Sequence, residues 1–208
     1  MSVELTPTDD CWVNDFPENR DRNLDRKGLG IGRWEALNRS YLKFDLSKVP
    51  FAGEALKYAE LRLYGKALFT PCLARVVQVS PAWNEETVTW NTQPSIYRSD
   101  GRYIMGETTE IPVEESWFSI PIDTFFVKRR WGRMLSMRIQ GYEGAEDSYF
   151  YAYDKEEAGG TYAPRLFLSV APPAPPKPPP PKPPWTGLAS LAMGVGLLLV
   201  KPPRLASP

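Results

Sequence analysis

Short runs in which apolar and polar residues alternate recur along the first 170 residues, and turn-forming residues separate them. Alternation with a period of two places successive side chains on opposite faces of a strand. Many short strands at such spacing are typical of a β-sandwich or jelly roll. We therefore expect an all-β fold, an antiparallel β-sandwich of jelly-roll type. Its strands are expected at residues 40–46, 61–64, 74–79, 87–90, 118–122, 135–139, 149–153 and 165–170.

The segment 83–94, with the sequence WNEETVTWNTQP, frames such an alternation with two tryptophans and a closing turn. It predicts a strand with Glu86, Val88 and Trp90 on one face. Helical spacing is confined to residues 123–131, which fit one or two helical turns that connect strands within the sandwich.

Four segments, taken in order, resemble the DNRLRE domain family: 39–50 (RSYLKFDLSKVP), 59–64 (AELRLY), 83–94, and 163–170 (APRLFLSV). Residues 10–15, 117–123 and 137–141 fit the same pattern. The family consists of extracellular β-sandwich modules and includes alginate-binding carbohydrate modules. The resemblance implies a sandwich over about residues 9–171, but it carries over no ligand-binding residue. The matched positions that build the fold are Phe44, Asp45, Trp83, Glu85, Thr89, Trp90, Asn91 and Pro94.

Tryptophans at positions like the family's strand or connector aromatics are expected in the core. These are Trp83, Trp90, Trp117 and Trp131.

Two cysteines, Cys11 and Cys72, are too few for a disulfide scaffold or a complete cysteine metal site. A single disulfide between them and two buried free thiols are both compatible with the sequence.

The composition changes after Ala171, and we expect four regions: a head at 1–171, a stalk at 172–184, an apolar helix at 185–200 and a short basic tail at 201–208. Residues 172–184 hold ten prolines and favour a polyproline II rod over a disordered spacer or a ligand for proline-binding domains. Residues 185–200 carry no charge, so we expect a short helix that inserts in a membrane or docks on a protein shell. Its anchoring side chains are Trp185, Leu188, Leu191, Val195, Leu198 and Leu199.

Charge is distributed unevenly between these regions. All 25 acidic residues and 21 of the 25 basic ones precede residue 172, so the head has a net charge of −4 and the tail +4. An acidic head is a poor partner for nucleic acid, which is bound by neutralising phosphates. The cationic tail favours an anionic lipid surface.

These features favour a non-enzymatic structural or attachment protein, held on a membrane or virion surface as part of a larger assembly. The alternative is a carbohydrate-binding module for a polysaccharide, acidic or not.

Residues 1–10 lack the basic and apolar regions of a secretory signal. We therefore expect a processed form, export without an N-terminal mark, or assembly into a particle. Few amide side chains and 22 prolines point towards a thermophilic source.

Exposed aromatic rings bind sugars by stacking, and basic clusters bind polyanions. The candidate glycan-binding residues are Trp34, Tyr97, Tyr103, Lys128, Arg129, Arg130 and Arg133. Tyr142 and Tyr162 belong to the same aromatic inventory. For Trp34, core and surface positions are equally compatible with its neighbours. For the basic cluster, the alternative is a solvated face of the domain.

Catalysis and metal binding have little support in the sequence. The chain has no histidine, the usual general base and the commonest zinc ligand. Its adjacent carboxylate pairs point to opposite faces of a strand, so no pair by itself forms a glycosidase site. We expect no enzyme and no cofactor, with a structural calcium ion as the one alternative to plain acidic turn residues. Its candidate ligands are Asp9, Asp10, Asp15, Asp45 and Asp154.

Overall fold

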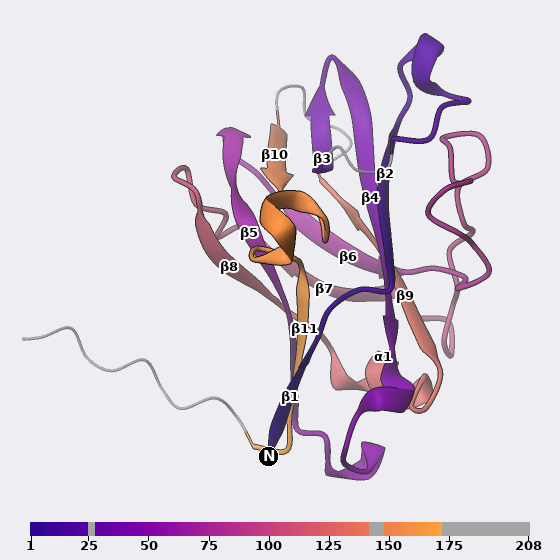
Figure 1. Ribbon diagram of the computed structural model, residues 1–208, viewed down its shortest axis with the longest axis vertical. Coiled ribbons are helices and arrows are strands. Elements are labelled where there is room, and N and C mark those ends of the chain that lie inside the picture. The colour runs from indigo at the N-terminus through magenta and orange to yellow at the C-terminus, as the bar shows by residue number, and fades with distance from the viewer. Residues whose placement is uncertain (25–27, 142–147, 172–208) are drawn as a thin grey trace, which may run out of the picture. The chain divides into compact units, whose positions relative to one another are not determined.

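The computed structural model describes residues 1–24, 28–141 and 148–171, and these residues are mostly antiparallel β-structure with little helix (Figure 1). The strands are β1 (Ser2–Leu5), β2 (Asp9–Asn14), β3 (Leu29–Trp34), β4 (Ala36–Asp45), β5 (Tyr58–Phe69), β6 (Ala74–Gln78), β7 (Ile104–Thr108), β8 (Ser116–Pro121), β9 (Met134–Gln140), β10 (Ser148–Ala152) and β11 (Arg165–Ser169). The helices are α1 (Thr124–Arg129) and the 3₁₀ turns η1 (Pro17–Asn19), η2 (Leu46–Lys48), η3 (Gly53–Ala55) and η4 (Glu157–Gly160).

The strands form one curled sheet in the order β1-β11-β5-β10-β3-β4-β9-β6-β7, with β8 added to β5 and β2 added to β4. The long strand β5 pairs with β11 and then β10, and with β8. We call β1, β11, β5 and β8 the open half of the sheet, and β2, β4, β9, β6 and β7 the covered half. The expected all-β, antiparallel class is confirmed, and the jelly-roll form remains a prediction.

The main core lies between the inward faces of the curled sheet. Leu61 and Leu63 of β5 are fully buried, as are Leu42 and Phe44 of β4, and all four belong to one apolar cluster. Burying one such side chain contributes about 2 kcal/mol. Their sequence neighbours point outward, as a period of two requires. The two halves differ in what becomes of those outward side chains.

Residues 80–103, the covering segment, lie on the outward face of the covered half, where Figure 1 shows them beside β2. Tyr41 and Val77 point to this face and form a second apolar cluster with Val88 of the covering segment. Trp83 and Trp90 pack against the cluster, so the matched tryptophans bind this loop to the sheet. Trp83 also donates a hydrogen bond from Nε1 to Ser136 Oγ at 2.6 Å.

The expected strand at 87–90 is wrong, because the covering segment consists of turns there. Local side chains satisfy its backbone: Asn84 Oδ1 accepts a hydrogen bond from Glu86 N at 2.8 Å, and Thr92 Oγ1 accepts one from Thr89 N at 3.0 Å. Asparagine and threonine compete in this way with strand pairing. Val88 nonetheless has a buried side chain, which packs in the second apolar cluster.

The other expected strands are confirmed, with shifted ends, and α1 confirms the helical turn at 123–131. The sequence analysis missed β1, β3 and β7. Trp117 was expected in the core and is 41 % exposed, so that assignment is wrong. Trp131 is half-buried against the main core. Cys11 and Cys72 are both buried and no disulfide joins them, which excludes the first of the two alternatives.

Several predictions concern residues that lie outside the described part of the chain. These are the proline stalk at 172–184, the apolar helix at 185–200 with Trp185, Leu188, Leu191, Val195, Leu198 and Leu199, and the basic tail at 201–208. Within residues 1–24, 28–141 and 148–171, no helix has the length and apolar character needed to cross a membrane.

Candidate functional site

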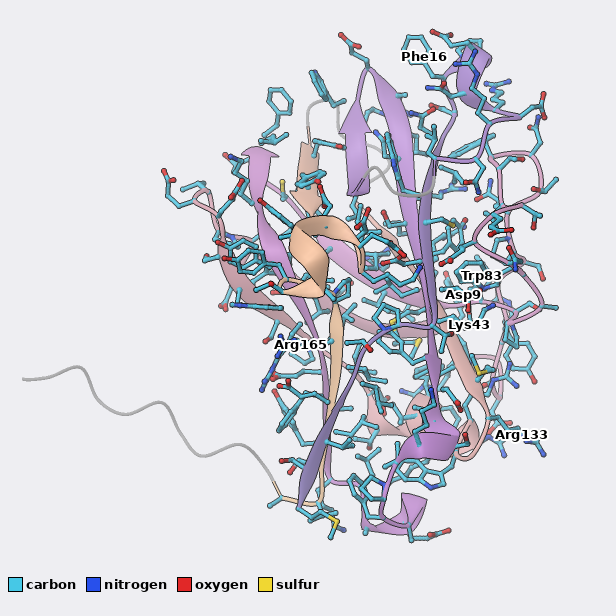
Figure 2. All side chains as sticks on the ribbon, in the orientation of Figure 1. Asp9, Phe16, Lys43, Trp83, Arg133 and Arg165 are labelled. Carbon is cyan, nitrogen blue, oxygen red and sulfur yellow. The ribbon has the colours of Figure 1, made fainter. Side chains whose placement is uncertain are left out.

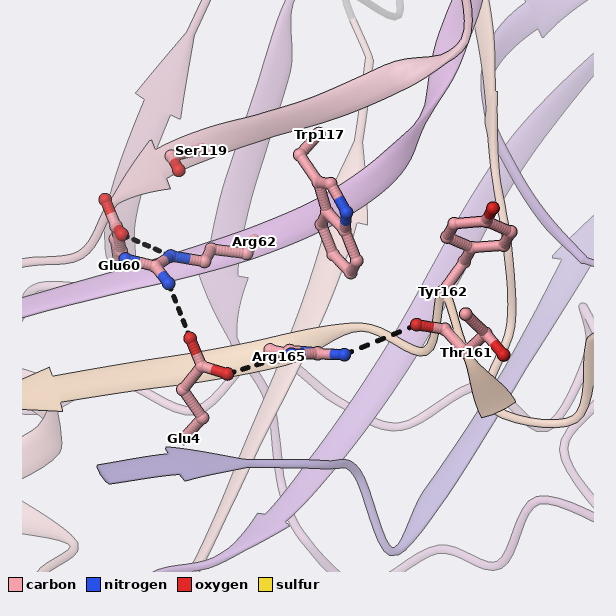
Figure 3. Close-up of a pocket in the computed structure, with 8 residues that line it drawn as sticks. All are labelled: Glu4, Glu60, Arg62, Trp117, Ser119, Thr161, Tyr162 and Arg165. Carbon is pink, nitrogen blue, oxygen red and sulfur yellow. Dashed lines mark hydrogen bonds and ion pairs between the residues drawn. The ribbon is translucent and has the colours of Figure 1, made fainter. Parts of the chain in front are cut away.

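The outward face of the open half carries aromatic and charged side chains around a hollow of about 470 Å³ (Figure 3). Strand alternation places them there: Trp117 and Ser119 of β8 flank the buried Phe118, and Arg62 of β5 lies between the buried Leu61 and Leu63. We call this the aromatic hollow. Its lining residues are Glu4, Glu60, Arg62, Trp117, Ser119, Thr161, Tyr162 and Arg165.

The rings beside the aromatic hollow support one another. Tyr162 stacks on Tyr64, with centroids 4.1 Å apart and planes within 15°. Trp117 meets Tyr64 edge-on at 5.6 Å, and Tyr153 meets Tyr162 edge-on at 5.4 Å. Stacked and edge-to-face pairs of this kind hold rings in fixed orientations. Trp117 is thus a large exposed ring on a rigid support.

Charged groups of the aromatic hollow form a continuous network across three strands. The Arg62 guanidinium binds the carboxylates of Glu60 and Glu4, and Glu4 also accepts from Arg165 Nη1 at 3.0 Å (Figure 3). Arg165 lies over the Trp117 ring at 5.1 Å and donates from Nη2 to the Thr161 carbonyl at 3.3 Å. Two guanidiniums and two carboxylates balance, so these four side chains contribute no net charge.

The segment 153–162 presents Thr161 and Tyr162 to the aromatic hollow, and the buried Asp154 shapes it. The carboxylate of Asp154 accepts hydrogen bonds from the backbone N–H groups of Gly28, Glu156 and Glu157, at 2.8, 2.9 and 2.7 Å. Three backbone donors are satisfied by one buried side chain, which is why the chain turns sharply before η4.

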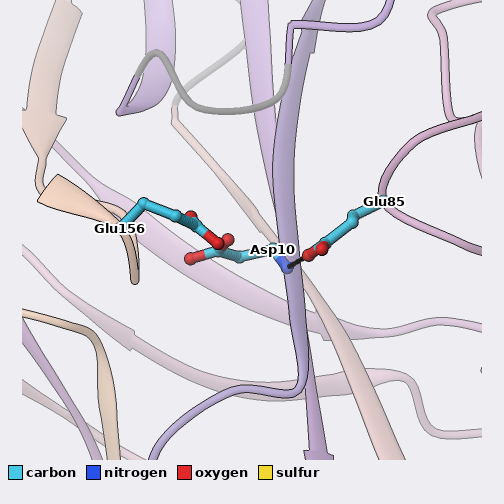
Figure 4. Close-up of side chains that lie close together, drawn as sticks. All are labelled: Asp10, Glu85 and Glu156. Carbon is cyan, nitrogen blue, oxygen red and sulfur yellow. Dashed lines mark hydrogen bonds between the residues drawn. The ribbon is translucent and has the colours of Figure 1, made fainter. Parts of the chain in front are cut away.

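An ionic cluster joins this segment to the covering segment across β2 (Figure 4). Asp10 is fully buried, and its carboxylate accepts from Lys155 Nζ at 3.1 Å and from Lys155 N at 2.8 Å. Lys155 Nζ also binds Glu156 at 2.8 Å and Glu85. Glu85 in turn accepts from Asp10 N at 3.0 Å.

Acidic ligand atoms of Asp10, Glu85 and Glu156 lie within 4.8 Å of one another, but all three carboxylates already bind the ammonium of Lys155. The other aspartates give no more support to a calcium site, because each carboxylate binds a different partner within the protein. Asp9 pairs with Lys43 at 3.0 Å, Asp15 accepts from Leu37 N at 2.7 Å, and Asp45 caps η2 by accepting from Ser47 N at 3.0 Å. The five aspartates therefore do not converge on one ion.

The ionic cluster predicts a pH dependence of folding. Burial raises the pKa of Asp10 from 3.8 to about 7, against the opposing charge of Lys155. Between pH 4 and pH 7 the folded protein thus holds a proton that the unfolded chain has lost, so rising pH lowers the free energy of unfolding, by up to about 4 kcal/mol. Urea denaturation of Asp10→Asn should show a shallower fall between pH 4.5 and pH 7.5 than the unsubstituted protein.

Asp45→Asn is the matched control for this measurement. Hydrogen bonds from Ser47 lower the pKa of Asp45, so its contribution is present above its unfolded pKa and is lost as the pH falls further. This variant should leave the slope between pH 4.5 and pH 7.5 unchanged. Equal slopes for Asp10→Asn and the unsubstituted protein would contradict the assignment.

The predicted basic cluster lines a second hollow, of about 300 Å³, at the end of α1. Arg129, Arg130 and Arg133 meet Tyr97 there, together with residues that the sequence analysis did not single out. We call this the basic hollow. Its lining residues are Tyr97, Arg98, Ser99, Asp100, Arg129, Arg130 and Arg133.

The remaining candidate glycan-binding residues lie elsewhere. Lys128 is exposed on α1 but does not line the basic hollow. Tyr103 is half-buried against the second apolar cluster beneath Arg98, so it supports the loop and is not a surface platform. Trp34 is 47 % exposed and packs between Phe69 and Tyr149 in a third hollow. Tyr142 lies outside the described residues.

Comparison with known protein families gives a match over most of the chain. The model of carbohydrate-binding module family 96 matches residues 1–170. The chain belongs to this family. No curated protein matches it. The resemblance read from the sequence therefore holds at the level of a carbohydrate-binding family.

Family 96 is a family of binding modules, and this favours the carbohydrate-binding alternative over the attachment protein that residues 172–208 favoured. Of the two rings that line the aromatic hollow of this family 96 module, the sequence analysis named Tyr162 as an exposed aromatic residue. It placed the other ring, Trp117, in the core. The alternation within β8 correctly predicted that every second side chain points outward. Only the structure shows that the covering segment leaves this outward face open.

Proposed function

We propose that this family 96 module binds a polysaccharide on the open half of the sheet, with the aromatic hollow as the contact site. The observation that carries the proposal is Trp117, a 41 % exposed ring whose orientation is fixed by Tyr64, beside a hollow of about 470 Å³. Sugar rings present apolar C–H faces that pack on such aromatic faces.

The network around Trp117 suits sugar hydroxyls. A hydroxyl both donates and accepts hydrogen bonds, and the hollow offers guanidinium donors at Arg62 and Arg165 beside carboxylate acceptors at Glu4 and Glu60. Because these groups already hold one another in place, a bound sugar orders few side chains, and little affinity is lost to entropy. The balanced charge favours uncharged stretches of a glycan over a densely anionic one.

The Trp117→Ala variant tests this proposal. We expect its affinity for the polysaccharide that the unsubstituted protein retains best to fall about 30-fold, because truncation of a central stacking tryptophan costs about 2 kcal/mol. Affinity gel electrophoresis through dextran, alginate and dextran sulfate gives the retardation of each variant. Thermal unfolding should change little, because Trp117 is 41 % exposed and belongs to neither apolar cluster.

Leu68→Ala and Trp34→Ala are matched controls. Leu68 is 44 % exposed on the same strand as Arg62 but does not line the aromatic hollow, so its loss should leave retardation unchanged. Trp34→Ala removes the exposed ring of the third hollow. If Trp34→Ala abolishes retardation and Trp117→Ala does not, the contact site lies at the third hollow and the proposal is wrong.

Other expectations stay proposals with less support. A membrane or virion location and a role in a larger assembly rest on the residues from 172 onward, and the thermophilic source rests on composition. The absence of catalysis agrees with membership of a family of binding modules. A polysaccharide partner is the expectation that the family match supports most directly.

A further inference from the structure

The basic hollow concentrates positive charge in a small volume. Four guanidiniums, those of Arg98, Arg129, Arg130 and Arg133, line about 300 Å³ with one carboxylate, that of Asp100. Asp100 is already bound by Arg129. Like charges that face one hollow repel one another. An anion in the hollow would relieve it.

Two of these guanidiniums are held in fixed planes by aromatic rings. Arg130 lies over Tyr97 at 4.6 Å and Arg98 lies over Tyr103 at 4.5 Å. Stacking restrains the plane of a guanidinium and leaves its N–H edge available for an acceptor. In addition, Arg130 Nε is a buried donor without a hydrogen-bond partner. A buried donor without a partner costs about 1–3 kcal/mol, and an oxyanion at this position would remove that cost.

The arrangement of the arginines favours a tetrahedral oxyanion over a flat carboxylate. They come from two separate segments, 97–100 and 129–133, which face one hollow. A carboxylate has two oxygens in one plane, and a single arginine can satisfy both. The three free oxygens of a sulfate ester point in three directions and accept from several arginines at once.

We propose that the basic hollow binds a sulfate half-ester on a polysaccharide. The proposal rests on the carbohydrate-binding function but concerns a different surface: Figure 2 shows Arg133 and Arg165, which line the basic and aromatic hollows, on different sides of the ribbon. A sulfated chain is favoured over nucleic acid because a phosphodiester has two free oxygens, one fewer than a sulfate half-ester.

The test compares dextran sulfate with dextran, which has the same backbone without sulfate, and with polygalacturonate, which carries carboxylates. We expect the unsubstituted protein to bind dextran sulfate at least tenfold more tightly than polygalacturonate at equal ionic strength. Arg133→Ala should weaken dextran sulfate binding about tenfold. Arg130→Lys, which keeps the charge and loses the planar donor fork, should weaken it several-fold. Inorganic sulfate should compete at millimolar concentration.

Lys128→Ala is the matched control, since it removes one positive charge from the same segment without touching the hollow. It should weaken dextran sulfate binding less than twofold. Equal losses in Arg133→Ala and Lys128→Ala would show unspecific attraction and overturn the proposal, as would equal affinity for polygalacturonate and dextran sulfate. Displacement of dextran sulfate by duplex DNA at equal charge concentration would also overturn it.

The two proposals fail in different ways. Trp117→Ala should change binding to all glycans by a similar factor and leave the preference for dextran sulfate over dextran intact. Arg133→Ala should remove that preference and leave dextran binding intact. If Trp117→Ala has no effect while Arg133→Ala does, the aromatic hollow is not the contact site, but the sulfate site stands. The opposite result refutes the sulfate site alone.

Discussion

Replacement of Gly32 by alanine is expected to cost at least about 4 kcal/mol of folding free energy and to leave much of the protein unfolded. Gly32 has φ 101°, in the region that side chains other than glycine rarely adopt. A Cβ atom there would lie 2.0 Å from the carbonyl oxygen of Ser148, on the neighbouring strand β10. Because the obstacle is backbone, a rotamer change cannot relieve it, and the β3–β10 pairing must separate. Circular dichroism and urea denaturation measure the effect.

Gly101→Ala is the control that measures the cost of a positive φ without the cost of a steric clash. Gly101 has φ 79°, and an added Cβ would meet nothing within 4 Å. This variant should lose only about 1 kcal/mol, the conformational cost of a side chain at positive φ. A similar loss in both variants would show that close approach of β3 and β10 does not limit what position 32 tolerates.

The same glycines explain why the sequence analysis missed β3. Its residues, LGIGRW, include two glycines, which are depleted in strands because they add no side chain to pack and cost entropy. Here their small size is what the pairing needs, since Gly30 also lies against Trp12 and Tyr149. Strand propensity reports the average environment, whereas the close contact arises only when strands far apart in sequence pair.

For the candidate site, alternation predicted correctly which residues share a face, but not which face stays open. Trp83 and Trp117 both lie in segments that read as amphipathic strands with large rings. The covering segment folds back so that the Trp83 ring packs against the Tyr41 ring, with centroids 6.0 Å apart, while Trp117 stays exposed. That difference depends on which half of the sheet residues 80–103 pack against, and no local sequence pattern predicts this packing.

The basic hollow was half predictable. Arg129, Arg130 and Arg133 are close in sequence, and their clustering follows from α1, which ends at Arg129. Arg98 and Tyr97 enter from a loop about 30 residues earlier, whose position is set by pairing of Tyr97 N with the Gln78 carbonyl at 2.9 Å. The sequence therefore named Tyr97 and the three arginines as candidates, but it did not show that their two segments meet in one hollow, and it missed Arg98.

Asp154→Ala is expected to destabilise the protein by about 4 kcal/mol and to weaken glycan binding as well. The substitution leaves three backbone donors of the 153–162 segment and its neighbour Gly28 without their acceptor, in a place where Asp154 is only 2 % exposed. Each unsatisfied buried donor costs about 1–3 kcal/mol. Urea denaturation measures the stability, and affinity electrophoresis below the unfolding transition measures the binding.

The binding loss follows from the position of Tyr162, eight residues after Asp154 and stacked on Tyr64 beside the aromatic hollow. Asp154→Asn keeps one carbonyl oxygen as acceptor and should lose only about half as much stability. Tyr162→Ala removes the ring and leaves the Asp154 hydrogen bonds, so it should reproduce the binding loss with little loss of stability. If Asp154→Ala lowers stability but binds glycan normally, the segment 153–162 does not position the site. Sugar contact would then depend on β5 and β8 alone, whose side chains the sheet fixes without help from that loop.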